Sequence, residues 1–147
     1  MIAVVGAGAV GSYFGGMLAR AGEPVTLIGR SAHVAAIQEH GLRIESPAWD
    51  ERVRVPASTD LADARGADIV LLCVKTGDTA DAGRALAPHL APGALVVSLQ
   101  NGIENADVLR LAAGLTAVRA VVYVAVSLEA PGHVRHTGRG DLILEAP

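Results

Sequence analysis

The feature that most constrains the fold is a glycine-rich stretch directly after the first few residues. An apolar run, Ile2–Val5, leads into this stretch, and a helical pattern follows from Val10 to Arg20. In such a strand–turn–helix unit the first glycine allows a sharp turn, the second lets a phosphate approach the backbone, and the third lets the helix pack against the strand. The helix N-terminus also favours an anion. We therefore predict a site for the pyrophosphate of a dinucleotide, with a purely structural turn as the alternative. The predicted contacts are Gly6, Ala7, Gly8, Ala9, Val10 and Gly11.

Composition narrows the class of protein. The 147 residues are enough for one domain, 51% of them are hydrophobic, and the formal net charge is −3. Neither a basic stripe for nucleic acid nor an apolar run of membrane-spanning length is present in the sequence. Met1–Val5 lacks the basic flank and cleavage site of a signal peptide, so we expect a strand there.

Cys73 is the only cysteine in the sequence. A single cysteine excludes an internal disulfide and fits a reducing cytoplasm. Because it lies within an apolar run, we expect it to pack in the core and not to act as a reactive thiol.

Strand and helix patterns alternate along the chain. This order is typical of an α/β fold of the Rossmann type, with a doubly wound, mostly parallel sheet and, after Pro131-Gly132, an antiparallel hairpin at the C-terminal end. We expect one domain over residues 1–147. Residues 46–58 are predicted to form a loop or a small hairpin. Trp49 is expected to anchor that loop, with a platform for base stacking as the alternative. The expected strands are 2–5, 25–28, 42–45, 68–74, 94–99, 116–128, 133–136 and 141–144, and the expected helices are 9–21, 31–41 (capped by Ser31), 60–65, 78–90 and 104–113.

Polar residues follow four of the predicted strands. They are the glycine stretch, Gly29-Arg30-Ser31, Lys75 and Gln100-Asn101-Gly102. Ligands of open parallel sheets bind beyond the carboxyl ends of the strands, so these residues are expected to lie at one edge and to form one site.

Arg30 indicates which dinucleotide is bound. A site for NAD usually has Asp or Glu about 20 residues after the glycine stretch, to accept from the ribose 2′-hydroxyl. Here Arg30 and Ser31 stand there instead, and a guanidinium favours a phosphate where a carboxylate would repel it. We predict that Arg30 and Ser31 bind the 2′-phosphate of NADPH; a solvated surface arginine is the alternative.

Lys75 and Asn101 complete the predicted site. Lys75 is the only lysine in the sequence, and its position suits a contact to a cofactor phosphate or ribose, or compensation of a substrate carboxylate. Asn101 is placed to hold the nicotinamide ribose or a substrate hydroxyl, although Asn-Gly is also a common turn signal. Metal ligands are not predicted, since the spacing of His133 and His136 fits no known template, and no Ser/His/Asp constellation is visible.

With these residues in place, the chain resembles the ketopantoate reductase (2-dehydropantoate 2-reductase) family over essentially its whole length. The resemblance is carried by residues 2–12, Arg30, Cys73-Val74-Lys75-Thr76, Leu99-Gln100-Asn101-Gly102-Ile103 and residues 131–138. It implies NADPH-dependent reduction of a 2-keto acid, ketopantoate to pantoate in pantothenate biosynthesis. It also implies that residues 6–11 cradle the pyrophosphate, Arg30 holds the 2′-phosphate, Lys75 reaches the cofactor, and Asn101 touches cofactor and substrate.

The same resemblance implies a second, helical domain that carries the proton-donating lysine. That domain is absent from this sequence, so no catalytic residue is predicted here, and we expect NADPH binding with little or no turnover. Strands that the second domain would cover are expected to promote self-association or a homodimer. Two other functions stay open: a non-catalytic NADP-binding module, and another NADP-linked dehydrogenase of the β-hydroxyacid type.

Overall fold

The computed structural model describes residues 1–146, which form an α/β fold built on one sheet of nine strands. Four α-helices and three short 3-10 helices (η) connect the strands of this part of the chain. In chain order the elements are β1 (Ile2–Val5), α1 (Ala9–Arg20), β2 (Val25–Ile28), α2 (Ser31–His40), β3 (Leu42–Glu45), β4 (Asp50–Val53), β5 (Ala57–Ser58), η1 (Leu61–Ala64), β6 (Ile69–Leu72), η2 (Thr76–Asp78), α3 (Thr79–Leu86), η3 (Ala87–His89), β7 (Leu95–Ser98), α4 (Asn105–Ala113), β8 (Ala117–Ala130) and β9 (His133–Leu144).

The sheet confirms the predicted doubly wound, mostly parallel topology. Its strand order is β4-β3-β9-β8-β7-β6-β1-β2-β5, and within residues 1–146 only the pairs β3–β4 and β8–β9 are antiparallel. From β1 the chain first builds toward β2 and β5, then returns to β6 and β7 on the other side. The strand order therefore reverses between β1 and β6, which is where ligands bind in folds of this kind.

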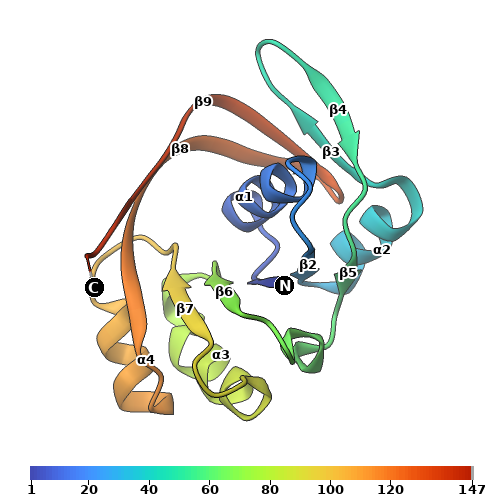
Figure 1. The fold of residues 1–147 in the computed structure, drawn as a ribbon. Coiled ribbons are helices and arrows are strands. Elements are labelled where there is room, and N and C mark those ends of the chain that lie inside the picture. Colours follow the sequence, from blue (N-terminus) through green and yellow to red (C-terminus); the bar gives the residue numbers. More distant parts are fainter. Residues whose placement is uncertain (147) are drawn as a thin grey trace.

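Two hydrophobic cores cover the two faces of the sheet. The sheet curves around α1, which lies inside the curve, while α3 and α4 lie outside it (Figure 1). Alternate residues of β1 serve the two cores, since Val4 packs on the α1 side whereas Ala3 and Val5 pack on the other. Both faces of the central strands are buried, which explains their continuous apolar sequences.

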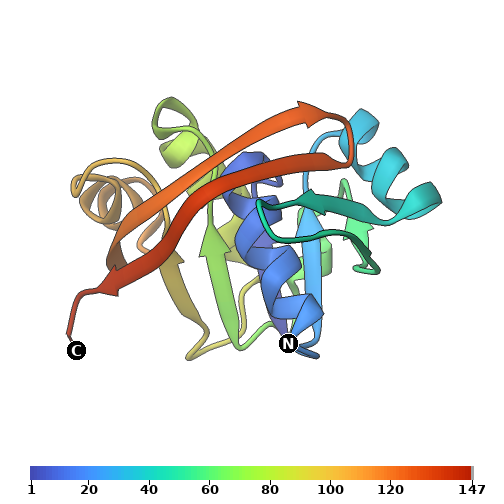
Figure 2. The same cartoon turned by 90° about the horizontal axis from the view of Figure 1, so that it is seen from above.

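The long β8–β9 ribbon crosses over α1 (Figure 2). Its inner face is apolar, and Val122, Val124 and Val126 pack against the α1 core. The predicted strand segments 133–136 and 141–144 are one continuous strand, β9. The register of the ribbon shifts between Tyr123 and Val124 and between Ala125 and Val126, where the partner residues change from Asp141 to Arg139 and from Gly138 to His136.

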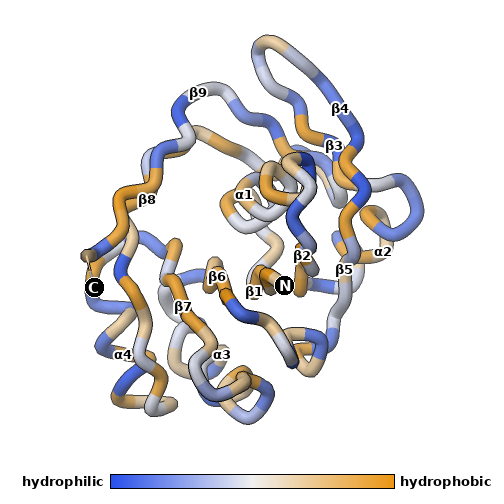
Figure 3. Tube along the Cα trace, in the orientation of Figure 1, coloured by the Kyte–Doolittle hydropathy of each residue, from blue (hydrophilic) through white to orange (hydrophobic). Residues whose placement is uncertain are grey.

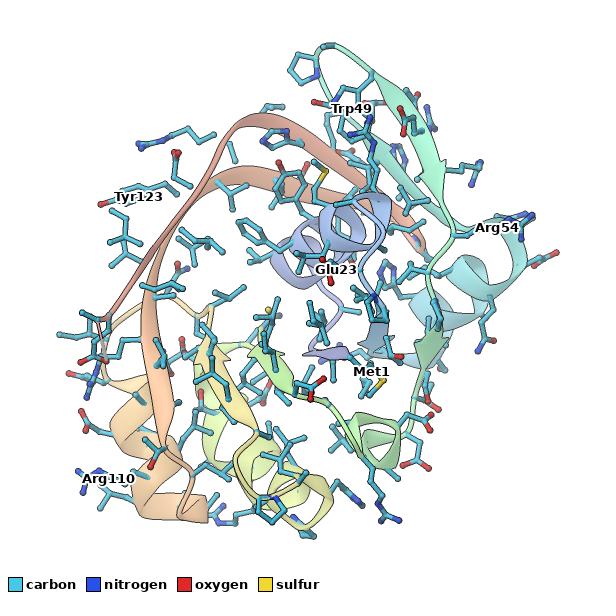
Figure 4. All side chains as sticks on the ribbon, in the orientation of Figure 1. Met1, Glu23, Trp49, Arg54, Arg110 and Tyr123 are labelled. Carbon is cyan, nitrogen blue, oxygen red and sulfur yellow. The ribbon has the colours of Figure 1, made fainter. Side chains whose placement is uncertain are left out.

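The strand at residues 42–45 is present, but it is not the third strand of the nucleotide-binding half. β3 pairs with β9 and forms a hairpin with β4, and the strand beside β2 is the two-residue β5. Residues 46–58, for which a loop or a small hairpin was predicted, thus contain the second strand of the β3–β4 hairpin and the short strand β5. Trp49 packs on the α1 core, and the Arg20 guanidinium lies 4.4 Å from its ring centre, as expected of a loop anchor (Figure 4).

Hydrophobic residues are concentrated in β6, β7 and β8 (Figure 3). On the outer face of the ribbon, Val121 pairs with Ile143, and Tyr123 follows two residues along β8. These three side chains are 43%, 57% and 39% exposed, respectively, and thus form an apolar strip on the surface.

Within residues 1–146, the helices are all too short or too polar to cross a bilayer.

Candidate cofactor site at the carboxyl edge of the sheet

The sheet register places the four predicted loops at one edge. Val5 of β1 pairs with Ile28 of β2 and with Leu72 of β6, and Leu72 pairs with Ser98 of β7. The last residues of four parallel strands therefore lie side by side. The loops that follow these strands contain the glycine stretch, Arg30, Lys75 and Asn101, and together they form the carboxyl edge.

The glycine stretch is held by close packing at its two ends. Gly6 has a φ of +100°, and a Cβ on it would lie 2.7 Å from the backbone of Cys73. A Cβ on Gly11 would lie only 2.1 Å from the Gly6 carbonyl oxygen. These two glycines are thus required by the turn and by the approach of α1 to β1.

Gly8 is different, since a Cβ there would meet nothing within 4 Å. It is exposed and stands at the N-cap of α1, where no side chain of the described residues caps the helix and no acidic residue occupies the first turn. Ala7 beside it is buried, and Ala9 and Val10 are half-buried. The open backbone at Gly8, at the positive end of a helix, is suited to an anionic group.

Arg30 is the N-cap residue of α2 and is exposed. The prediction that Ser31 caps this helix is wrong, because Ser31 is its first residue and no side-chain hydrogen bond caps this end. The reason is the extended backbone of Arg30 (φ −75°, ψ 152°), which makes Arg30 the N-cap, so the cap lies one residue earlier than the pattern had indicated. Ser31 is also exposed, so its hydroxyl stays beside the guanidinium of Arg30 in sequence and at the same edge.

Lys75 and Asn101 follow the neighbouring strands β6 and β7, and both are exposed. Their loops touch, since the Thr76 hydroxyl donates to the Asn101 carbonyl oxygen at 3.3 Å. Among the described residues neither Arg30 nor Lys75 forms an ion pair, whereas seven other arginines do. The structure thus brings these cations together with the glycine stretch and leaves them without carboxylate partners in residues 1–146.

A buried polar cluster lies beneath these two loops. Gln100 donates to the Val74 carbonyl oxygen at 2.9 Å and to the Thr79 hydroxyl at 2.7 Å, and its Oε1 accepts from Ser98. The Asn105 amide donates to the Asn101 carbonyl oxygen at 2.9 Å. Because the cluster links the residues on either side of Lys75 to those around Asn101, it fixes the two loops relative to each other.

Sequence reasoning missed four residues that lie near these loops, namely Ser12, His33, Thr79 and Asn105. All four are polar and buried. The only signal for them was their type and place, since each is a polar residue in or next to the first turns of a helix that starts at the carboxyl edge. Gln100 was noticed as part of a motif, but its role as the centre of a buried cluster was not.

The remaining chemistry-bearing groups do not change this assignment. Burial raises the pKa of the Cys73 thiol to about 12, as expected of a packing residue. No group of three or more potential metal ligands is found in the part of the chain that the structure describes. Two open hollows of about 420 and 350 Å³ lie elsewhere, by residues 37–41 with 54–57 and by residues 22–26, and contain none of the predicted contacts. Met1 and Glu23, both labelled in Figure 4, line the second hollow. Because they precede β1 and β2, this hollow lies at the opposite, amino edge of the sheet.

The topology and the carboxyl edge define the class: this is an α/β domain of the dinucleotide-binding type. Comparison with known proteins identifies the family within this class. The family described as "Ketopantoate reductase PanE/ApbA" matches residues 2–147. The 2-dehydropantoate 2-reductase of Pyrococcus abyssi is 41% identical over 143 residues, which are 97% of this chain and 46% of that protein.

Solved structures of related proteins have the same fold as this chain. A PanE/ApbA family ketopantoate reductase from Ralstonia eutropha JMP134 is 55% identical, with a TM-score of 0.94 over 98% of this chain and 49% of that one. A D-mandelate dehydrogenase solved with NADH and anilino(oxo)acetate is 27% identical, with a TM-score of 0.86 over 98% of this chain and 48% of that one.

The chain therefore belongs to the ketopantoate reductase family, whose members are oxidoreductases of the NAD(P)-dependent dehydrogenase type. It spans about half the length of the relatives it matches and corresponds to their N-terminal, cofactor-binding half.

Proposed function

We propose that this chain binds NADPH as the cofactor half of an NADPH-dependent 2-keto acid reductase, with ketopantoate as the substrate of the complete enzyme. The observation that carries the proposal is the register of β2, β1, β6 and β7, which aligns the glycine stretch, Arg30, Lys75 and Asn101 at one edge. Family membership supports the keto acid as the substrate class.

Each predicted contact has a role in this proposal. The backbone of Gly6, Ala7, Gly8, Ala9, Val10 and Gly11 holds the pyrophosphate, and Arg30 with Ser31 holds the 2′-phosphate. Lys75 contacts the cofactor, and Asn101 contacts both the cofactor and the keto acid. Bound NADPH supplies the hydride.

Reduction of a ketone also requires a proton for the developing alkoxide. The family resemblance implies that this proton comes from a lysine of a second domain of the complete enzyme, and the only lysine of this sequence, Lys75, has a cofactor role in the proposal. Without a general acid a step of this kind is slower by about 10²–10⁴-fold. We expect the chain alone to bind NADPH and to show almost no NADPH oxidation with ketopantoate; rapid turnover would refute this division of roles.

The apolar strip of Val121, Tyr123 and Ile143 supports a further expectation, that copies of the chain associate through the β8–β9 ribbon. Tyr123→Glu would then lower the mass measured by light scattering at high concentration. A monomer at all concentrations would contradict this expectation. A cytoplasmic location is part of the proposal and fits the single cysteine.

The test of cofactor identity is a titration of the chain with NADPH and with NADH, followed by nucleotide fluorescence. NADPH is expected to bind at least about tenfold more tightly than NADH, since a hydrogen bond to a charged group contributes roughly 1.5–3 kcal/mol. Arg30→Asp should abolish this preference. Arg54→Asp is the matched control, because Arg54 is exposed and lines the same hollow as Met1 and Glu23, at the amino edge of the sheet.

The structural similarity to an enzyme solved with NADH favours one alternative, a chain that uses NADH. Equal affinity for the two nucleotides, unchanged by Arg30→Asp, would support that alternative and would overturn the assignment of Arg30. Binding of neither nucleotide would refute the cofactor role of the chain.

A further inference from the structure

A chain of three buried hydrogen bonds is centred on His33, which is only 7% exposed. Its Nε2 lies 2.8 Å from the Ser12 hydroxyl oxygen, and the Ser12 hydroxyl donates to the Ala7 carbonyl oxygen at 3.0 Å. On the other side of the ring, the Gly132 N–H donates to Nδ1 at 2.8 Å.

The direction of the three bonds follows from the acceptor at Nδ1. Because Nδ1 accepts from Gly132, it carries no proton, and the neutral ring has its proton on Nε2. Nε2 therefore donates to Ser12, whose own hydrogen is given to Ala7. Burial lowers the pKa of His33, which is consistent with a neutral ring.

The bond to Ala7 determines where the next amide points. In a trans peptide the carbonyl and the following N–H point in opposite directions. Holding the Ala7 carbonyl toward Ser12 therefore turns the Gly8 N–H away from α1 and the protein interior. Gly8 is exposed and has open space around it, so this N–H is directed to the position where an anion would bind.

His33 also joins two loops of the carboxyl edge. It lies in the first turn of α2, three residues after Arg30. The loops are in contact at Gly29, where a Cβ would lie 2.7 Å from the Ala7 Cβ. Ser12 and His33 thus tie the glycine stretch to the start of α2, where Arg30 stands.

The second hydrogen bond of the His33 ring, which Nδ1 accepts from the Gly132 N–H, holds the turn between β8 and β9. Gly132 has a φ of +74°, and a Cβ on it would lie 3.1 Å from the Ala36 Cβ of α2. This bond docks the ribbon on α2 and has no contact with the glycine stretch. The two ring nitrogens therefore have separable tasks.

We propose that His33 is a positioning residue of the dinucleotide site, which acts through Ser12 to orient the Ala7–Gly8 peptide so that the Gly8 N–H faces the pyrophosphate. This inference rests on the proposed function as far as the ligand is concerned. The orientation of the peptide itself is a property of the free chain.

Two substitutions of His33 each keep one of the two hydrogen bonds of the ring and remove the other. In His33→Gln the amide nitrogen reaches the place of Nε2 and still donates to Ser12, but nothing accepts from Gly132. In His33→Asn the amide oxygen takes the place of Nδ1 and still accepts from Gly132, but the side chain does not reach Ser12. Ser12→Ala removes the bond to Ala7 and should behave like His33→Asn.

The measurements are NADPH affinity and amide hydrogen exchange of the free chain, followed at Gly8 and Gly132 by NMR. His33→Gln should keep NADPH affinity within about threefold of the original chain while Gly132 exchanges faster. His33→Asn and Ser12→Ala should weaken NADPH binding by about tenfold and alter exchange at Gly8, with Gly132 unchanged in His33→Asn.

Equal loss of affinity in His33→Gln and His33→Asn, in step with their loss of thermal stability, would show a purely structural role and overturn the proposal. So would unchanged affinity and unchanged Gly8 exchange in His33→Asn. If the original chain bound no nucleotide, the proposed function would fail, and the Gly8 exchange in the free variants would still decide whether His33 orients the peptide.

Discussion

Two polar regions of this molecule differ in whether their charged side chains form ion pairs. On β3, β4 and β9 the charged side chains form ion pairs with one another. Arg43 lies 2.7 Å from Asp50, and Glu45 accepts from both Arg43 and Arg135. At the carboxyl edge, Arg30 and Lys75 form no ion pairs within residues 1–146, while the groups beneath them are hydrogen-bonded and buried.

The difference shows where a ligand is expected. Paired charges on a surface neutralise each other and contribute little to stability or to binding. Cations left without carboxylates above a rigid set of buried hydrogen bonds are available to an anion and need little rearrangement to bind it. The two hollows described above, which lie elsewhere, are therefore a poorer guide to the site than these cations.

The largest expected effect concerns the backbone packing that builds the carboxyl edge. Gly11→Ala should unfold the chain or lower its stability by about 3 kcal/mol or more, because the new Cβ would overlap the Gly6 carbonyl oxygen. Gly8→Ala is the matched control and should leave the stability nearly unchanged, since its Cβ meets nothing within 4 Å.

Thermal denaturation measures the stability of both variants, and NADPH titration measures binding. Gly8→Ala should still weaken NADPH binding by about tenfold or more, because its methyl group would fill the space for the phosphate. A Gly8→Ala chain that is stable and binds normally would show that the ligand does not approach this backbone.

A smaller effect is expected from the buried cluster beneath Lys75 and Asn101. Gln100→Leu should cost about 1–3 kcal/mol of stability, because it removes the buried amide that donates to the Val74 carbonyl oxygen and to the Thr79 hydroxyl. Gln38→Leu is the control, since Gln38 is exposed and donates only to the Ala57 carbonyl. Chemical denaturation compares the two; equal losses would mean that the buried cluster is no more important than a surface bond.

The smallest effect belongs to the paired region. Arg135 is the main cause that lowers the pKa of Glu45, so their pair stabilises the fold above the ordinary pKa of a glutamate, 4.5, and this contribution is lost as the pH falls below that value. Arg135→Ala should therefore lower the melting temperature slightly at pH 7 and less at pH 3. Arg52→Ala, on the same face, is the control. A larger loss at pH 3 than at pH 7 would contradict this sign.

The sequence was sufficient for much of the fold and for the loops of the site. Strands 2–5, 25–28 and 42–45 were predicted with their exact bounds, because two mainly apolar runs and the alternating stretch Leu-Arg-Ile-Glu each end at glycine or polar residues. The four loops were expected at one edge because parallel strands align their carboxyl ends.

Other features depend on contacts that sequence patterns do not contain. The pairing of β3 with β9 joins segments about ninety residues apart, and β5 is too short to give a pattern. The start of α2 at Ser31 depends on the backbone angles of Arg30. The general preference for serine as an N-cap residue does not contain this information. The bonds from His33 to Ser12 and Gly132 need three elements to come together, so a buried histidine could not be distinguished beforehand from an exposed one.

The central claim is that a phosphorylated dinucleotide binds at the carboxyl edge. The most direct measurement is a nitrogen–proton correlation spectrum of this 15.0 kDa chain during titration with NADPH. We predict that the shifted amides belong to residues 6–11, 29–31, 75–76 and 101–102, and that NADH shifts the same amides only at higher concentration. Shifts gathered around residues 54–57, or a spectrum that NADPH leaves unchanged, would contradict the claim.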